Sequence, residues 1–351
     1  MASEYVRLAV AGFAYESWTQ AAVGYGAKQA APAFAVTVTD ATDDWGDKWN
    51  FMPGTECSLT ANGDLIVTGI IDKMTPSFDA SNHTVNITGR SKSKDTIDSA
   101  AEHETGEMRN MTPLQIAQAL DKQGVGFTSS AQMDKVPLFR INPGETVFEA
   151  VERVCRKQEL MLMGTPQGGI EIAAGETKRV HPALQEGDGF MLGGSATLDE
   201  SDQHSEYKVR GQKVYGTDKG SLQVDVTTKN SNVSRHRPKH VIPESDIDED
   251  SGSKRGKNHR NKQQAKGITA SIKTQGWHDQ NGKLWVPNTL ITIISAKLKL
   301  QMDLLLNDVH LTYGPQGSFS QLNFVQPSAN GSSASTGSKT DAVWQNQNQD
   351  V

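Results

Sequence analysis

Residues 284–326 constrain the fold more than any other part of the chain. From residue 297 to residue 304 polar and apolar side chains alternate at every position, and a period of two is typical of a β-strand with one buried face. The β-branched run at 290–294 fits a strand buried on both faces. Alternation resumes at Val309, and a Gly-Pro-Gln-Gly turn leads to a final strand. Together with an Asn-Gly turn at 281–282, this pattern predicts a small antiparallel barrel.

Composition limits the alternatives. Only 36% of the 351 residues are hydrophobic and 32 are glycine, which favours several small β-rich modules over one large enzyme core. The net charge of −6 gives no overall attraction to nucleic acid or anionic lipid. Two cysteines, Cys57 and Cys155, exclude a disulfide scaffold and fit a reducing cytoplasm. We expect no membrane-spanning segment and no signal peptide.

The first hundred residues predict a first barrel. Alternating apolar residues begin at Val6 and again at Phe34, Asn62-Gly63 marks a hairpin, and residues 85–87 form a further strand. Two tryptophans, Trp45 and Trp49, lie in an acidic loop that is expected to cover a barrel end or form an interface. We assign residues 1–100 to this barrel and expect a strand from about 190–212 to complete it.

Residues 103–180 predict a small α+β domain inserted between two barrels. Thr112-Pro113-Leu114-Gln115 is a capping box with proline at the first helical position, and Gly124 is expected to end that helix. A second helix opens at Thr146 with Glu149 as its reciprocal cap, and Cys155 falls on its apolar face. A hairpin around two glycines, 168 and 169, follows.

Residues 213–326 are assigned to the second barrel. Within them we expect a charged loop at 227–267, acidic at first and then basic from 254 to 266. Gly256 and two asparagines make the basic stretch a poor helix former, and the sequence leaves open whether 254–266 is a helix or a mobile loop. Residues 327–351 predict a flexible tail. No convincing internal repeat appears in the sequence, although two barrels could be structural duplicates without one.

Side chains with ligand or nucleophile chemistry occur without the partners that a site requires. His236 and His240 lie on either side of a proline and lack a third ligand, and the acidic run at 246–250 lacks the glycine and glutamate of a calcium loop. The glycines at 24–26 lack the context of a phosphate loop, and Ser195 lacks a nucleophile elbow. We therefore predict a protein that is not an enzyme and holds no metal or cofactor.

One pair of motifs resembles a known family. Gly276-Trp277-His278-Asp279, followed by Trp285-Val286-Pro287-Asn288, is similar to the second barrel of hub proteins from contractile-tailed phages. A Gly-Arg pair at 89–90, ahead of an acidic and apolar segment, resembles the end of their first barrel. The six motif residues are expected to be structural, with both indoles anchoring a core: Gly89, Arg90, Trp277, Trp285, Pro287 and Asn288.

The resemblance implies a mainly β chain with two small antiparallel barrels and an inserted α+β domain. It further implies a homotrimer in which two barrels per chain form a ring of six similar units around a channel. Such a ring would join a tail tube protein to a separate central spike protein and contact other baseplate proteins, with no specific recognition of nucleic acid. It would be assembled in the bacterial cytoplasm and reside in the virion.

Two alternatives remain open from the sequence. The chain could be the hub part of a type VI secretion or bacteriocin spike, which shares the architecture. It could also be a glycan-binding or hydrolase module of the virion that acts on the cell wall.

Overall fold

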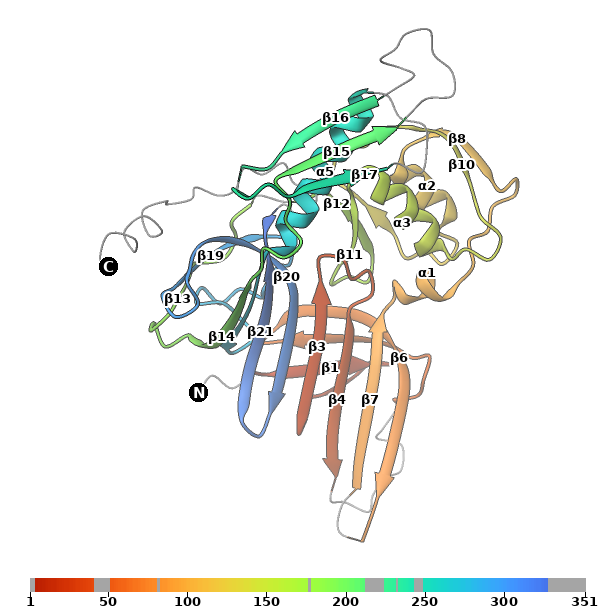
Figure 1. The fold of residues 1–351 in the computed structure, drawn as a ribbon. Helices are drawn as coiled ribbons and strands as arrows, with labels where there is room; N and C mark the ends of the chain where they lie inside the picture. Colours follow the sequence, from red (N-terminus) through yellow and green to blue (C-terminus); the bar gives the residue numbers. More distant parts are fainter. Residues whose placement is uncertain are drawn as a thin grey trace, which may run out of the picture.

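The computed structural model describes residues 4–40, 51–80, 83–175, 178–211, 224–231, 233–242 and 249–327. Most of this chain is β-structure in antiparallel sheets (Figure 1). One sheet of 13 strands contains both the N-terminal and the C-terminal strands, and three small sheets lie outside it. The expectation of a mixed, mainly β fold is confirmed.

Seven strands form the N-terminal part of the large sheet. They are β1 (Val6–Val10), β2 (Phe13–Tyr15), β3 (Gln20–Gly26), β4 (Ala33–Asp40), β5 (Glu56–Ala61), β6 (Asp64–Phe78) and β7 (His83–Ser91). Their order across the sheet is β3-β4-β7-β6-β5-β1-β2. We call β1 and β3 to β7 the first unit.

Six further strands form the C-terminal part. They are β13 (Leu184–Gln185), β14 (Met191–Leu198), β18 (Ile268–Gln275), β19 (Leu290–Ser295), β20 (Leu300–Gly314) and β21 (Gly317–Val325). We call these six strands the second unit. The two units are joined edge to edge because β20 pairs antiparallel with β3, from Asp308 opposite Gly26 to Tyr313 opposite Ala21. The ladders of the described strands end at β2, β13 and β14 without closing.

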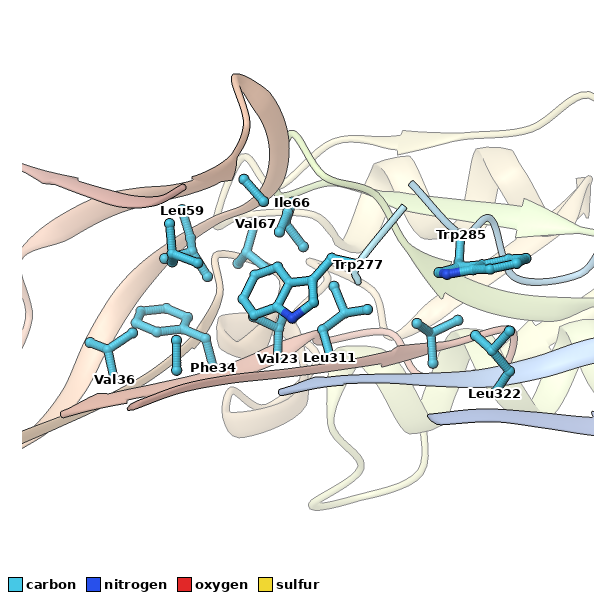
Figure 2. Packing of buried hydrophobic residues seen from close by; sticks show 14 of the residues in the cluster. Val23, Phe34, Val36, Leu59, Ile66, Val67, Trp277, Trp285, Leu311 and Leu322 are labelled. Carbon is cyan, nitrogen blue, oxygen red and sulfur yellow. The ribbon is translucent and has the colours of Figure 1, made fainter. Parts of the chain in front are cut away.

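A single hydrophobic core runs through both units. It includes side chains from every strand of the first unit and from most of the second. In Figure 2 the indole of Trp277 lies among Ile66 and Val67 of the first unit and Leu311 of the second. Burial of such a large aromatic side chain across the boundary stabilises the two units as one body.

The inserted domain has a separate core of helix and strand side chains. Its elements are α1 (Lys94–Asp98), β8 (Glu107–Met111), α2 (Pro113–Leu120), β9 (Phe127–Thr128), β10 (Val136–Arg140), α3 (Val147–Lys157), β11 (Met161–Gly164) and β12 (Ile170–Ala173). Both capping boxes are present, at Thr112 with Gln115 and at Thr146 with Glu149. Helix α2 ends at Leu120 rather than at Gly124. The carboxylate of Asp121, the next residue, accepts the backbone N–H groups of Val125 and Gly126, and this holds the chain in a turn instead of a further helical turn.

A third small sheet corrects the expectation for residues 190–212. Strand β14 pairs with β18 of the second unit, so this stretch does not complete the first. Strand β15 (Glu206–Gly211) lies instead between β16 (Val224–Lys229) and β17 (Pro238–Val241). Strand β14 is the edge strand of the second unit, next to β18, and the following strand β15 already belongs to the separate small sheet.

The basic run at 254–266, for which the sequence leaves helix and loop open, is part of a helix. Helix α5 (Glu249–Lys266) packs on β15 and β16. The glycine in this helix has a packing role that intrinsic propensity does not reveal: a Cβ at Gly256 would lie 2.5 Å from Oγ1 of Thr228 and 3.3 Å from a methyl group of Val209. Glycine permits this close approach of helix and sheet, so packing outweighs the poor intrinsic propensity.

Two further expectations have different outcomes. Residues 296–299 form the turn between β19 and β20 instead of the start of a strand, and Lys299 takes a positive φ of 55° there. Trp45, Trp49, the acidic run at 246–248 and the tail beyond residue 327 lie outside the described residues.

Candidate functional site: two corner motifs in a duplicated unit

The two units share one topology. Numbered in chain order, the six strands of the first unit pair in the order first, fourth, fifth, sixth, third, second. The second unit has the same order. The fourth, fifth and sixth strands contain 6, 15 and 9 residues in both units. The pairing of the first with the fourth strand differs in direction, since it is antiparallel in the first unit and parallel in the second.

The long fifth strands also carry the same irregularity. The register with the sixth strand shifts between Ile71 and Lys73 in β6, and between Leu306 and Asp308 in β20. A bulge increases the local twist and bends the strand. The two units are therefore structural duplicates, and matching the bulges places Lys73 equivalent to Asp308.

A corner motif precedes the fourth strand in each unit. In the first unit Gly54 N–H donates to the carbonyl of Ile71 and Ile71 N–H donates to that of Thr55, at 2.8 and 3.0 Å. In the second unit Asn288 and Thr289 make the same two bonds with Leu306, at 2.8 and 2.9 Å. Both corner residues need a left-handed backbone, with φ of 88° at Gly54 and 60° at Asn288, which glycine and asparagine adopt most readily.

The resemblance extends along the motif sequence. Phe51-Met52-Pro53-Gly54-Thr55 corresponds to Trp285-Val286-Pro287-Asn288-Thr289. The aromatic residue is buried in both, and the next residue is exposed to 60% in the first unit and 41% in the second. Sequence reasoning missed this repeat because only the proline and the threonine are identical. The pattern that could have revealed the repeat is an aromatic residue followed, two positions later, by Pro-x-Thr.

Trp277 ties the second unit to the start of the chain. Its backbone N–H donates to the carboxylate of Glu4 at 2.7 Å, and its indole N–H donates to the carbonyl of Thr312 at 2.9 Å. The next residue, His278, lies 3.4 Å from Glu4 and 3.2 Å from the carboxylate of Asp64. Glu4 lies just before β1, and Asp64 is the first residue of β6. This cluster therefore links the second unit to the first.

The charges in this cluster support one another. The hydrogen bond and charge of Glu4 raise the pKa of His278, with Asp64 adding to the effect and burial opposing it. Burial works to raise the pKa of Glu4, but hydrogen bonds from His278 and from Trp277 N–H outweigh it and hold that pKa below its usual value. The pair is therefore ionised over the weakly acidic range.

A second histidine, His181, orders the corner of the second unit. Its Nε2 accepts the backbone N–H of Val286 at 2.9 Å, which fixes the ring as the neutral tautomer with hydrogen on Nδ1. That Nδ1 donates to Asp279 at 2.8 Å, and both side chains are wholly buried. Burial lowers the pKa of His181, and the bond to Asp279 only partly offsets this.

The remaining contacts of this corner reach three other parts of the chain. The imidazole of His181 lies 4.9 Å from the indole of Trp285, between ring centroids. The carbonyl of Trp285 accepts the hydroxyl of Tyr25 at 2.9 Å, and Asn288 donates from Nδ2 to the carbonyl of Ala174 at 2.9 Å. Sequence reasoning missed His181 and Glu4, which lie 98 and 273 residues from their partners.

The Gly-Arg pair links the first unit to the inserted domain. Arg90 donates from Nε to Asp72 in β6 at 2.7 Å and from Nη2 to Asp98 in α1 at 2.8 Å. Burial works to raise the pKa of Asp72, but hydrogen bonds from Arg90 and Lys94 outweigh it and lower that pKa. A Cβ at Gly89 would lie 2.5 Å from the ring of Phe34, so the strand requires glycine there.

The other candidate residues are dispersed. Ser195 lies in β14 and His240 in β17, on different sheets. Cys57 and Cys155 are buried, which raises the pKa of each thiol to about 12. The described ranges contain no group of three or more side chains that could hold a metal ion. Within the same ranges, no helix is both long and apolar enough to cross a bilayer.

Comparison with known proteins shows what this architecture belongs to. Family models for the Mu phage baseplate assembly protein GpP-like N-terminal domain, the baseplate hub protein gp44-like second domain and the GpP fourth domain match residues 5–91, 93–174 and 250–331. The chain belongs to the family of phage baseplate hub proteins, whose members are structural proteins and not enzymes.

Among its relatives is the baseplate hub protein gp44 of Escherichia phage Mu. The two are 30% identical over 338 residues, which covers 90% of this chain and 85% of that protein. The resemblance to hub proteins that the tryptophan motifs indicated is confirmed.

Solved structures share the fold. The 43 kDa tail protein of prophage MuSo2 from Shewanella oneidensis has a TM-score of 0.82 at 24% identity, with 93% of this chain and 99% of that chain covered. A tail protein from Neisseria meningitidis MC58 has a TM-score of 0.77 at 18% identity, covering 94% and 99%. The E. coli c3393 component of a type VI secretion system has a TM-score of 0.58 at 8% identity, covering 91% and 75%.

Proposed function

We propose that this chain is the symmetry adaptor of a contractile-tail baseplate. Three copies form a ring whose six similar units surround a channel, and the ring joins the sixfold tail tube to a separate, threefold central spike. The observation that carries the proposal is the duplication: two units with one strand order, one set of strand lengths and one bulge position. A chain with two equivalent units needs only three copies to imitate sixfold symmetry.

The cluster around Trp277 has a clear task in such a ring. Six units can be evenly spaced around a channel only if the two units of each chain keep a fixed relative orientation. The shared core, the β3–β20 ladder and the Glu4–His278 contact hold the two units together. The six motif residues are proposed to act through these contacts and not through a ligand: Gly89, Arg90, Trp277, Trp285, Pro287 and Asn288.

The inserted domain and the small sheet are placed to distinguish two faces of the ring. Figure 1 shows both at one end of the large sheet, while the β6–β7 hairpin extends toward the other end. One face would then present six similar hairpins, and the other would alternate three inserted domains with three small sheets. The adaptor is assembled in the bacterial cytoplasm and becomes part of the virion, where it contacts other baseplate proteins and lines the route of genome ejection.

The phage hub is favoured over its alternatives by the relatives. Identity of 30% to a phage hub along 90% of the chain outweighs the likeness to type VI components, which shows the fold alone. A cell-wall hydrolase is at odds with membership of a structural family.

Native mass spectrometry of the purified chain tests the proposal. The expected species has three times the chain mass of 38.1 kDa. A chain that stays monomeric at concentrations up to about 100 μM, or that forms dimers, would contradict it.

A further inference from the structure

Among the unpaired strand edges of the large sheet in the described residues, two belong to long strands, β6 and β14. Strand β5 covers β6 only as far as Ile70, which leaves the same edge of residues 73–78 open. Strand β14 pairs with β18 on one side only. Figure 1 shows β14 and β6 on opposite sides of the molecule. Open edges with unpaired N–H and C=O groups invite pairing with another chain.

The duplication says what should meet each edge. Inside the chain, the fifth strand of the second unit, β20, pairs with the second strand of the first unit, β3. The open edges belong to the equivalent strands with the units exchanged: β6 is a fifth strand and β14 is a second strand. We propose that residues 73–78 of one copy pair antiparallel with β14 of a second copy, repeating the β20–β3 joint between chains. This inference rests on the proposed trimer and specifies its interface.

The internal joint also fixes the register. The matched bulges place Thr75 equivalent to His310, and His310 lies opposite Gly24. Following the ladders from the bulges through the sixth and third strands places Gly24 equivalent to Thr197. Thr75 should therefore lie opposite Thr197 of the second copy. The neighbouring pairs follow, namely Lys73 with Asp199, Met74 with Leu198, Pro76 with Ala196, Ser77 with Ser195 and Phe78 with Gly194.

The side chains match at every position of this register. Apolar residues of β6 meet apolar or small residues of β14, hydroxyl groups meet hydroxyl groups, and Lys73 meets the opposite charge of Asp199. Opposed pairs of this kind stabilise antiparallel strands. The register follows from the backbone ladders alone, so the match between the side chains supports it independently.

Exposure supports the same conclusion. Phe78 is 86% exposed and Leu198 is 45% exposed, although both are large apolar residues in strands. Within the chain, the strand β20 that does have its neighbour buries Val309 and Leu311 completely. Of their equivalents, Met74 is half-buried and Pro76 is exposed. A second copy seated on this edge would bury them in the same way.

Pro76 makes the joint between chains weaker than the joint within the chain. Ala27 N–H donates to the carbonyl of Asn307 across the internal joint, so Asn307 and every second residue after it point their backbone groups toward β3. Pro76 is equivalent to Leu311 of that series and has no N–H to donate. One hydrogen bond is lost, which suits a joint that forms only when chains assemble.

The proposed joint between chains is heterologous. Each copy offers a β6 edge to one neighbour and a β14 edge to the other, so the contact repeats head to tail. A ring of three chains then contains alternating internal and external joints between successive units.

Disulfide trapping tests the register. Thr75 and Thr197 form a pair without mutual backbone hydrogen bonds in this register, for which Cα atoms lie about 4.5 Å apart, within the range that a disulfide bridges. The double variant Thr75→Cys/Thr197→Cys is oxidised with oxidised glutathione and run on a denaturing gel without reductant. The native cysteines, Cys57 and Cys155, are buried.

We expect the double variant to form covalently linked dimers and trimers. The control Ser77→Cys/Thr197→Cys, two residues out of register, and each single variant should remain at chain mass. Equal linking in the control, or no linking while native mass spectrometry still reports a trimer, would overturn the proposed joint and leave the trimer standing. A monomer by native mass spectrometry would overturn both.

Discussion

The contact between Glu4 and His278 offers the sharpest test of how the two units are held together. Replacing Glu4 by glutamine keeps an oxygen that can accept the N–H of Trp277 but removes the charge that faces His278. Both side chains are largely buried, with exposed fractions of 3% and 10%, so solvent screens this pair weakly.

The magnitude follows from the geometry. Removing one partner of a buried, hydrogen-bonded ion pair costs roughly 2–5 kcal/mol, and the 3.4 Å contact between Glu4 and His278 places this pair at the lower end, because Nδ1 of His278 makes no hydrogen bond of regular geometry to Glu4. We expect a loss of about 2 kcal/mol at pH 6. An unfolding entropy near 2.1 cal/mol/K per residue converts this into a Tm lower by about 3 °C.

The effect should depend on pH in a defined direction. The pKa of His278 is raised above its usual 6.5, so its stabilising contribution is full below about pH 6.5 and is lost as the pH rises through the raised pKa. The pKa of Glu4 is lowered below 4.5, so its contribution is lost only on acidification through that lowered value. The cost of Glu4→Gln should therefore shrink by at least half between pH 6 and pH 9.

Thermal melts of four proteins provide the assay: wild type, Glu4→Gln, His278→Gln and the double variant. The coupling energy from this cycle should be about 1–2 kcal/mol at pH 6 and close to zero at pH 9. A coupling energy that is zero at pH 6, or that does not change with pH, would refute the argument.

Substitutions at three further positions, each with its own comparison, test the corner of the second unit and the small sheet. Asn288→Ala should lower the free energy of unfolding by about 1 kcal/mol more than Asn288→Gly, since a Cβ at φ 60° is strained and glycine is not; equal melting temperatures would contradict this. Gly256→Ala should destabilise α5 by about 1–2 kcal/mol despite the better helix propensity of alanine, because the methyl group meets Thr228; helical circular dichroism during melting, with the exposed Lys257→Ala as control, measures it. His181→Gln should be less stable than wild type at pH 7 and closer to it at pH 5, because the lowered pKa of His181 makes its contribution full above about pH 6.5 and lost as the pH falls; a gap that widens on acidification in melts at the two pH values would count against it.

Local patterns were enough to predict several of the helices and strands. Alternation located the strands on either side of the Gly-Pro-Gln-Gly turn, and the capping boxes at Thr112 and Thr146 located two helices. These features depend on neighbours within a few residues, so a single sequence contains them in full.

Features that depend on distant partners could not be predicted. Gly256 marks a poor helix in isolation, and only its contact with Thr228 turns the same glycine into a packing requirement. Likewise, nothing near His181 in the sequence indicates that Asp279 and Val286 N–H enclose its ring.

The duplicated unit escaped sequence analysis for a related reason. Strand pairing preserves only the alternation of buried and exposed positions, so Met74 can stand for Val309 and Phe51 for Trp285. The corner residues Gly54 and Asn288 share a left-handed backbone and not a side chain. Topology and hydrogen bonds reveal the repeat, and residue identity hides it.

The central claim is that each chain contributes two equivalent units to one ring. Cryo-electron microscopy class averages of the purified protein, viewed along the symmetry axis, test it most directly. We expect a threefold ring with six similar units, in which the two units of a chain superpose by a rotation of about 60° around the shared axis. Separate particles with one pair of units, or rings whose two units do not superpose by that rotation, would contradict it.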